Sequence, residues 1–370
     1  MDESFEWGRE LFLRGVTEYQ AGRYAEAEWR FAEALALVPG RVSTLTNLGA
    51  VRLKLGRAAD ALVVLDQALA QEPDNVEALS QRATALASLG RHEEALRDFD
   101  RSLTLRPAQG AAWSYRGNVL REMGLLAEAR LSFEQALAHG ADRELNSYYL
   151  AALGGNDAPL SSPGGYVQSL FDSYAGEFDS HLVKQLRYDA PGVLAARIAA
   201  EGRHFRRALD LGCGTGLCGA ALAPLCDAID GVDVSGAMLE KARALRVYSE
   251  LDQVDVVLAL QQARHRYEAV IAADVFAYLG DLEPVFAGVA RVLEAGGLFC
   301  FTVEAGEESE AAAGFVLRPS LRYAHSRAYL LRLAQAHGFE ARHIESRPIR
   351  EDQRVPIPGL FIWLALPKPS

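Results

Sequence analysis

The sequence predicts a chain of two domains, a solenoid of paired helices followed by an α/β domain built on a parallel sheet. Three observations support this prediction. Residues recur with a strict period of 34 through the first part of the chain, and a short apolar strand with a glycine-rich turn begins at residue 208. Beyond that turn, predicted strands and helices alternate, which is typical of a parallel sheet covered by helices on both faces. A length of 370 residues suits about two such domains.

The period of 34 residues divides the first part of the chain into four units, 8–41, 42–75, 76–109 and 110–143. Glycine recurs where the first helix of each unit should end, and a small residue recurs inside that helix, where it lets a second helix approach closely. The glycines at the helix ends are Gly22, Gly56, Gly90 and Gly124. The small residues inside the helices are Gly15, Gly49, Ala83 and Gly117. Proline closes three of the units at Pro39, Pro73 and Pro107.

This period and pattern resemble the tetratricopeptide repeat. The resemblance implies a curved solenoid at residues 1–153, with a capping helix after the fourth repeat and a concave groove that binds a protein, peptide or carrier-bound substrate. Residues 154–165 are rich in glycine, proline and serine and are expected to form a linker. The alternative is that the repeats only buttress the second domain or a dimer.

The second domain, expected at 166–370, is organised around the sequence ALDLGCGTG at residues 208–216. Glycines without a Cβ atom let a ligand approach the backbone, and the helix that follows presents free N–H groups. Gly214 and Gly219 formally satisfy the dinucleotide fingerprint G-x-G-x-x-G. However, Asp233 follows Gly219 by 14 residues, which is shorter than the roughly 20 expected for a nicotinamide cofactor. A glycine turn without a ligand is the remaining alternative.

The run LDLGCGTG, together with GVDVSGAMLEKA at residues 231–242, resembles class I S-adenosylmethionine-dependent methyltransferases. The resemblance implies a Rossmann-like sheet with strand order 3-2-1-4-5-7-6 and S-adenosylmethionine as the cofactor. It implies that Asp233 accepts the ribose hydroxyls and that Asp255, within a strand expected at 253–257, accepts the adenine amino group. The full set of implied cofactor contacts is Tyr174, Asp210, Gly212, Cys213, Gly214, Gly216, Asp233, Val234, Met238, Asp255 and Ala273.

Residues 166–186 are expected to form two short lid helices, because they resemble the segment that covers the cofactor in many small-molecule methyltransferases. Residues 275–281 and 315–329 resemble a bacterial family in which tetratricopeptide repeats are fused to a methyltransferase. We expect His325 to be the catalytic base, since its ordinary pKa lies near 6.5, and Tyr278 and Tyr323 to orient the acceptor. A histidine that merely caps a helix at the surface is the alternative for His325.

The composition excludes several classes of function. The net charge is −11 and no basic tract stands out, which argues against nucleic acid and an anionic membrane as partners. The four cysteines have neither disulfide nor zinc spacing, and no metal site can be assembled from the sequence; a reducing cytoplasm is expected. Abundant alanine and arginine indicate a bacterial source. The leading hypothesis is a methyltransferase, against a non-catalytic assembly protein or a nicotinamide-dependent oxidoreductase.

Overall fold

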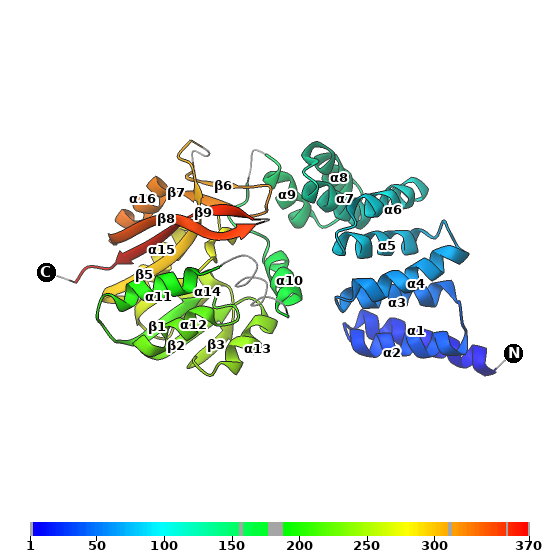
Figure 1. Ribbon diagram of the computed structural model, residues 1–370, viewed down its shortest axis with the longest axis horizontal. Coiled ribbons are helices and arrows are strands. Elements are labelled where there is room, and N and C mark those ends of the chain that lie inside the picture. Colours follow the sequence, from blue (N-terminus) through cyan, green and yellow to red (C-terminus); the bar gives the residue numbers. More distant parts are fainter. Residues whose placement is uncertain (1–2, 155–157, 177–187, 310–312, 353, 369–370) are drawn as a thin grey trace. The chain divides into compact units, whose positions relative to one another are not determined.

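The structure is a computed structural model that describes residues 3–154, 158–176, 188–309, 313–352 and 354–368. The chain divides into two compact units, Met1–Leu153 and Gly154–Ser370 (Figure 1). Unit one is helical throughout its described part, whereas unit two combines a large sheet with helices. The predicted fold class, a helical repeat domain followed by an α/β domain, is confirmed.

Helix pairs repeat through unit one with the predicted period. The second helices of the pairs begin at residues 24, 58, 92 and 126, in steps of 34. The pairs are α1 (Glu3–Gln20) with α2 (Tyr24–Leu37), α3 (Val42–Lys54) with α4 (Ala58–Gln71), α5 (Val76–Ser88) with α6 (His92–Leu105), and α7 (Gly110–Glu122) with α8 (Leu126–Ala138). A further helix, α9 (Arg143–Ala152), follows the last pair.

The small residue inside each first helix is a requirement of packing. A Cβ atom on Gly49 would lie 2.6 Å from the side chain of Leu65, and one on Gly117 would lie 2.5 Å from Phe133. Real Cβ atoms do not come so close, so only glycine lets the helices of these pairs approach as they do. Gly56, which follows α3, has a φ of +73°, a left-handed conformation that favours glycine at a helix end.

The sheet of unit two has the order that the resemblance implied. Parallel strands run β3-β2-β1-β4-β5, and the C-terminal hairpin adds β9 antiparallel to β5 and then β8. These strands are β1 (Phe205–Leu211), β2 (Cys226–Asp233), β3 (Glu250–Gln253), β4 (Tyr267–Ala272), β5 (Leu293–Gly306), β8 (Glu340–Asp352) and β9 (Val355–Ala365). The strands numbered 5, 6 and 7 in the predicted order 3-2-1-4-5-7-6 correspond to β5, β8 and β9.

Alternation along the strands separates two hydrophobic cores, one on each face of the sheet. Leu209, Val270 and Phe299 face one core, while their neighbours Ala208 and Ile271 face the other. The first core is covered by α14 (Val256–Gln262), α15 (Glu283–Val292) and α16 (Arg327–Ala336). The second is covered by α11 (Ala190–Ala199) and α12 (Leu217–Leu222). β4 and the middle of β5 are buried on both faces and have the nearly continuous apolar sequences typical of central strands in parallel sheets.

Two local expectations were wrong. Residues 253–257 do not form one strand, because β3 ends at Gln253 and α14 begins at Val256. The segment from 315 to 326 contains a small hairpin that was not anticipated, β6 (Phe315–Leu317) with β7 (Tyr323–Ser326), and β7 pairs with the last residues of β5. Of the two expected lid helices, α10 (Gly164–Tyr174) is present, and the second falls outside the described residues.

None of the helices in the described ranges combines the length and the apolar character that crossing a membrane requires.

Candidate functional site

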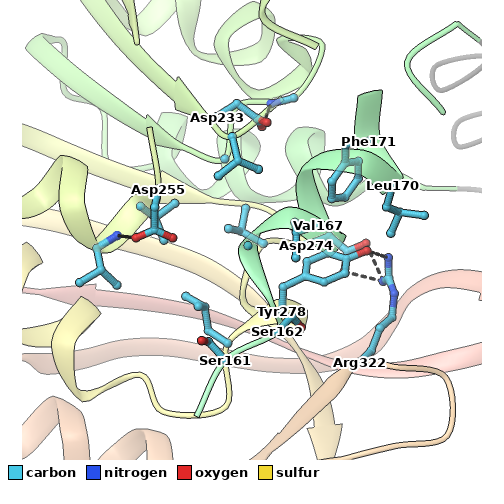
Figure 2. A pocket seen from close by; sticks show the side chains of 18 of the residues that line it. Ser161, Ser162, Val167, Leu170, Phe171, Asp233, Asp255, Asp274, Tyr278 and Arg322 are labelled. Atoms are coloured by element: carbon cyan, nitrogen blue, oxygen red, sulfur yellow. Dashed lines mark hydrogen bonds and ion pairs between the residues drawn. The ribbon is translucent and has the colours of Figure 1, made fainter. Parts of the chain in front are cut away.

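A cavity of about 740 Å³ lies at the carboxyl ends of the parallel strands in unit two (Figure 2). Its lining comes from the turns that follow β1, β2, β3 and β4, and from α10. In open parallel sheets this edge is where ligands bind, because the strand ends and the helix N-termini converge there. The volume falls in the range of roughly 300–1,000 Å³ that is typical of ligand sites.

Two glycines in the turn after β1 have different structural roles. Gly212 and Gly214 have φ values of +64° and +54°, and both line the cavity. A Cβ atom on Gly214 would meet no atom within 4 Å, whereas one on Gly212 would lie 2.5 Å from Val275. Gly214 therefore leaves open space beside the backbone, where a ligand can approach, and Gly212 allows the turn to pack against the loop after β4.

Asp233, the last residue of β2, holds this turn in place. Its Oδ2 accepts a hydrogen bond from the backbone N–H of Gly214 at 2.9 Å, and its Oδ1 accepts one from Ser235 at 2.8 Å. The side chain lines the cavity, and burial raises its pKa. A carboxylate has about four acceptor positions, so these two bonds leave room for a ligand's hydroxyl groups.

Asp255 also lines the cavity, but in a different structural context from the one expected. It is the N-cap of α14, and its Oδ1 accepts hydrogen bonds from Val257 at 2.8 Å and from Leu258 at 3.2 Å. Val234, Ala273 and Tyr174 complete the predicted cofactor residues that line the cavity. The structure thus brings together residues from four separate strand ends and α10.

Four predicted cofactor residues lie behind the cavity wall. The lining does not include Asp210, Cys213, Gly216 or Met238. Asp210 is 1% exposed and accepts a hydrogen bond from the Tyr248 hydroxyl at 2.7 Å; burial raises its pKa to about 7. Gly216, with a φ of +99°, is the residue before α12.

The N-terminal edge of unit two forms part of the cavity wall, in a segment that was expected to be a linker. Leu160, Ser161 and Ser162 line the cavity. The carbonyl oxygen of Leu160 accepts hydrogen bonds from Gly280 at 2.8 Å and Asp281 at 3.0 Å. Residues 160–162 are therefore tied to the loop after β4, although the glycine-, proline- and serine-rich composition of residues 154–165 predicts only a linker.

Two further hydrogen bonds hold α10 over the part of the cavity that Asp233 lines. The Ser235 hydroxyl donates to Oδ1 of Asp172 at 2.6 Å, and Lys241 Nζ donates to the Gly176 carbonyl at 3.2 Å. These bonds attach α10 to α13 (Gly236–Ala244). The sequence does not single out Asp172, because an acidic residue on an amphipathic helix is typical of a solvated face.

Of the three expected catalytic residues, only Tyr278 lines the cavity. His325 on β7 is fully buried, its Nε2 lies 3.0 Å from the Gly280 carbonyl, and burial lowers its pKa to about 4. Tyr323 is also fully buried and its hydroxyl donates to the Pro159 carbonyl at 2.6 Å. Both side chains support the loops around the cavity from outside, which corrects the expected direct roles.

The loop after β4 contains the most heavily bonded charged group of the site. Asp274 has a φ of +57°, an uncommon conformation for a residue with a side chain. Its carboxylate accepts hydrogen bonds from Arg350 and Arg322, and the same arginines bond Glu304. Arg322, Arg350 and Asp274 line the cavity. Arg322 lies in the segment 315–329 that the sequence singled out, but Arg350 lies outside every motif noted in the sequence, so only the fold brings the two arginines to one carboxylate.

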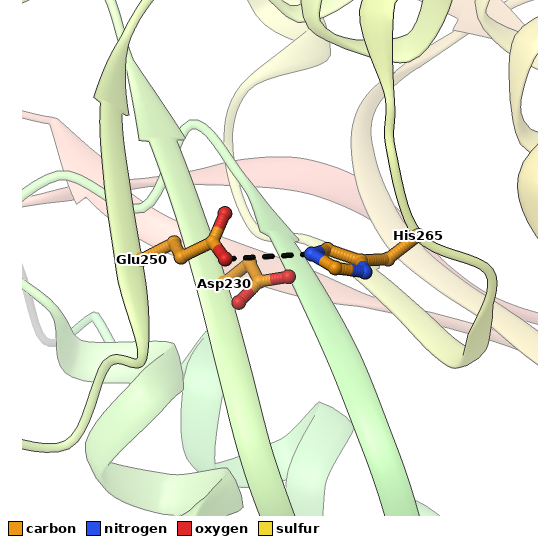
Figure 3. A group of neighbouring side chains, drawn as sticks. All are labelled: Asp230, Glu250 and His265. Atoms are coloured by element: carbon orange, nitrogen blue, oxygen red, sulfur yellow. Dashed lines mark hydrogen bonds and ion pairs between the residues drawn. The ribbon is translucent and has the colours of Figure 1, made fainter.

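Asp230, Glu250 and His265 form a separate cluster, drawn in Figure 3. One potential ligand atom from each lies within 4.8 Å of the others, a spacing compatible with a metal ion. However, Arg207 Nε lies 3.1 Å from Asp230 Oδ2, and Arg207 Nη2 lies 3.7 Å from Glu250. A guanidinium therefore already supplies positive charge here, and we interpret the cluster as an ion-pair network.

Two family models match the chain. The model described as a methyltransferase domain matches residues 209–299, and the model of the tetratricopeptide repeat matches residues 18–85 and 52–114. The chain has no match among curated proteins.

Several solved structures are similar in fold to parts of the chain. The N-methyltransferase NodS from Bradyrhizobium japonicum WM9, in complex with S-adenosyl-l-homocysteine, is 15% identical; the alignment covers 55% of this chain and 99% of NodS, with a TM-score of 0.44. Magnesium protoporphyrin IX methyltransferase from Synechocystis PCC 6803 is 16% identical over 55% and 98% of the two chains, with a TM-score of 0.42. The first tetratricopeptide repeat of Spaghetti (RPAP3), bound to an HSP90 peptide, is 24% identical over 32% and 94%, with a TM-score of 0.31.

The matched regions coincide with the helix pairs of unit one and with the glycine-rich core of the sheet in unit two. The chain therefore carries tetratricopeptide repeats within residues 18–114 and, within residues 209–299, a domain of the methyltransferase class that uses S-adenosylmethionine.

Proposed function

We propose that unit two transfers the methyl group of S-adenosylmethionine to a substrate that the repeats of unit one recruit. The observation that carries the proposal is the pairing of an open Gly214 with the Asp233 carboxylate at adjacent strand ends. A glycine backbone beside a carboxylate suits a ligand that contains a ribose. The ribose hydroxyls can donate hydrogen bonds to the carboxylate, while the rest of the ligand passes close to the glycine.

The residues of the cavity fit this cofactor in order across the sheet. Asp255 follows β3 and Asp233 ends β2, while Gly212 and Gly214 follow β1 and Asp274 follows β4. Neighbouring strands are about 4.8 Å apart, so Asp255 after β3 is three strand spacings from the Asp274 loop and Asp233 at the end of β2 is two. We assign the adenosine to the Asp233 and Asp255 side, and the methionine end to the Gly214 and Asp274 side.

When bound, the cofactor supplies an electrophilic methyl group on a sulfonium whose leaving group is a neutral thioether. The protein's contribution is then to align the acceptor and to exclude water. Asp233 and Gly214 orient the cofactor, and α10, held by Asp172, covers it. Tyr278 and Arg322 lie at the far side of the cavity from Asp233 in Figure 2 and are assigned to the acceptor.

The repeats of unit one support a role in recruiting the substrate. A solenoid of helix pairs has an extended concave face, and such faces usually bind peptides or proteins. We therefore assign unit one to binding a protein or carrier-bound substrate, which the cavity of unit two then modifies.

Calorimetric titration of the full chain tests the cofactor directly. S-adenosylmethionine and S-adenosylhomocysteine should both bind, and reduced nicotinamide adenine dinucleotide should not. Binding of the nicotinamide cofactor alone would contradict the proposal. Binding of both adenosyl ligands without transfer to any acceptor drawn from a pull-down on residues 1–150 would favour a non-catalytic assembly protein. Successful transfer would appear in mass spectrometry as a gain of one methyl group on the captured molecule.

A further inference from the structure

Two arginines on the acceptor side of the cavity, Arg350 and Arg322, both contact the carboxylates of Asp274 and Glu304, but at different distances. Arg350 Nη1 donates to both oxygens of Asp274, at 2.9 and 3.0 Å, and its Nη2 bonds Glu304. Arg322 Nη1 lies 3.3 to 3.4 Å from oxygens of the same carboxylates, beyond the roughly 2.7–3.2 Å usual for such bonds. Its side chain is 21% exposed, against 7% for Arg350. Arg350 thus makes the shorter bonds to the two carboxylates, and Arg322, which is held to them by longer contacts and is more exposed, is the guanidinium that can turn to a ligand.

Tyr278 adds a second donor beside Arg322. Arg322 Nη2 donates to the Tyr278 hydroxyl at 2.7 Å, so the phenol oxygen acts as the acceptor of that bond. The phenol hydrogen then points in another direction and can be donated to a ligand. Both residues line the cavity, as Figure 2 shows. A guanidinium with a neighbouring hydroxyl donor suits an oxyanion, and a planar carboxylate in particular.

The walls next to this pair are apolar. Val167, Leu170 and Phe171 of α10 line the cavity together with Leu279. The Phe171 ring lies 5.4 Å from that of Tyr278 in an edge-to-face arrangement. An apolar chain extending from the bound oxyanion would bury its surface against these side chains.

The described lining of the cavity offers few candidates for a general base beside Arg322 and Tyr278. No histidine, cysteine or lysine is among its described lining residues. Asp274 is bonded by two arginines, and Asp281 accepts hydrogen bonds from the Tyr329 hydroxyl and the Glu283 amide, both at 3.0 Å. An alcohol or an ammonium acceptor must lose a proton to a base, whereas a carboxylate with an ordinary pKa near 4 is already ionised at neutral pH.

From these observations we infer that the acceptor is a carboxylate on an apolar chain, held by Arg322 and Tyr278, and that a carboxylate oxygen receives the methyl group. An oxygen lone pair forms the new C–O bond while the methyl–sulfur bond breaks and its electrons pass to sulfur. The products are a methyl ester and S-adenosylhomocysteine, and no proton is transferred. This inference rests on the proposed function, because S-adenosylmethionine supplies the methyl group.

Three probes that differ only in the head group test the inference: octanoate, octanol and octylamine. Each is titrated into the full chain saturated with S-adenosylhomocysteine. Octanoate should bind at least tenfold more tightly than the other two, and with S-adenosylmethionine it should yield methyl octanoate, detected by gas chromatography with mass spectrometry. Tighter binding of octylamine, or N-methyloctylamine as the product, would overturn the inference.

Variants locate the probe. Arg322→Gln should weaken octanoate binding at least tenfold and Tyr278→Phe several-fold, with affinity for S-adenosylhomocysteine within twofold of the parent. Arg347→Gln is the matched control, because Arg347 lies on the same strand as Arg350, pairs with Asp189 at 2.8 Å and is not in the cavity lining. Octanoate affinity that is unchanged in both Arg322→Gln and Tyr278→Phe would overturn the inference. Failure of the parent chain to bind S-adenosylhomocysteine would instead count against the proposed function.

Discussion

The backbone N–H of Gly214 donates a hydrogen bond to Oδ2 of Asp233 at 2.9 Å, and this bond joins the end of β2 to the turn after β1. The two residues are 19 positions apart in the sequence. One residue presents open space to the cavity and the other presents a carboxylate. Their contact holds the glycine turn and the carboxylate together, an arrangement that favours preorganised recognition.

Gly214→Ala should weaken binding of S-adenosylhomocysteine at least tenfold while the fold survives, because the new Cβ atom would enter open cavity space. Its positive φ should cost about 1–2 kcal/mol of stability. Gly338→Ala is the control, since Gly338 has a φ of +75° and a Cβ atom on it would likewise meet no atom within 4 Å, but it is not in the cavity lining. Calorimetry and chemical unfolding separate the two effects. Equal affinities in both variants would contradict our assignment of the glycine turn.

Asp233→Ala should weaken S-adenosylmethionine and S-adenosylhomocysteine to nearly the same extent, because both contain the ribose. We expect a loss of about 2–4 kcal/mol, given ~1.5–3 kcal/mol for a hydrogen bond to a charged group. Part of this loss comes from the bonds that Asp233 makes to Gly214 and Ser235. Asp230→Asn, three residues earlier on β2 and outside the cavity lining, should leave both affinities near the parent values. A loss in Asp230→Asn alone would contradict the register we assign to β2.

Asp210 should make stability depend on pH in a definite direction. Burial raises its pKa to about 7 in the folded chain, against about 3.9 in an unfolded one. Between these values the folded state retains a proton that the unfolded state has lost, so the free energy of unfolding falls as the pH rises. Asp210→Asn cannot ionise and should gain stability relative to the parent across this window, by up to about 4 kcal/mol. Urea unfolding at pH 4.5 and 7.5 measures the difference, and a difference that does not grow with pH would refute the assignment.

Residues 158–163, which we call the strap, should be required for the stability of unit two and for its binding of S-adenosylhomocysteine. A fragment beginning at residue 158 keeps the bonds from Tyr323 to Pro159 and from Gly280 to Leu160, and one beginning at residue 166 loses both. We expect the longer fragment to bind S-adenosylhomocysteine like the full chain and the shorter one to bind several-fold more weakly, with a lower melting temperature. Calorimetry and thermal unfolding of both fragments provide the comparison. Equal behaviour of the two would show that the strap is dispensable.

The sequence by itself determined the repeat array and the strand end that bears the glycine turn. Both depend on short-range rules. The period of 34 residues follows from the length of one helix pair. Glycine is required at positions such as Gly49 and Gly117, because the second helix of the pair approaches closely there. The order of strand, glycine turn and helix likewise places Gly214 and Asp233 at one sheet edge, because parallel strands end together.

Only the tertiary structure decided the network around Asp274. Asp274, Glu304, Arg322 and Arg350 meet because β4, β5, the turn before β7 and β8 converge, and no spacing in the sequence encodes that convergence. His325 has the residue type of a base, but the β6–β7 hairpin buries its ring outside the cavity. Residue type determines what a side chain can do chemically, whereas long-range packing determines which side chains face the same space.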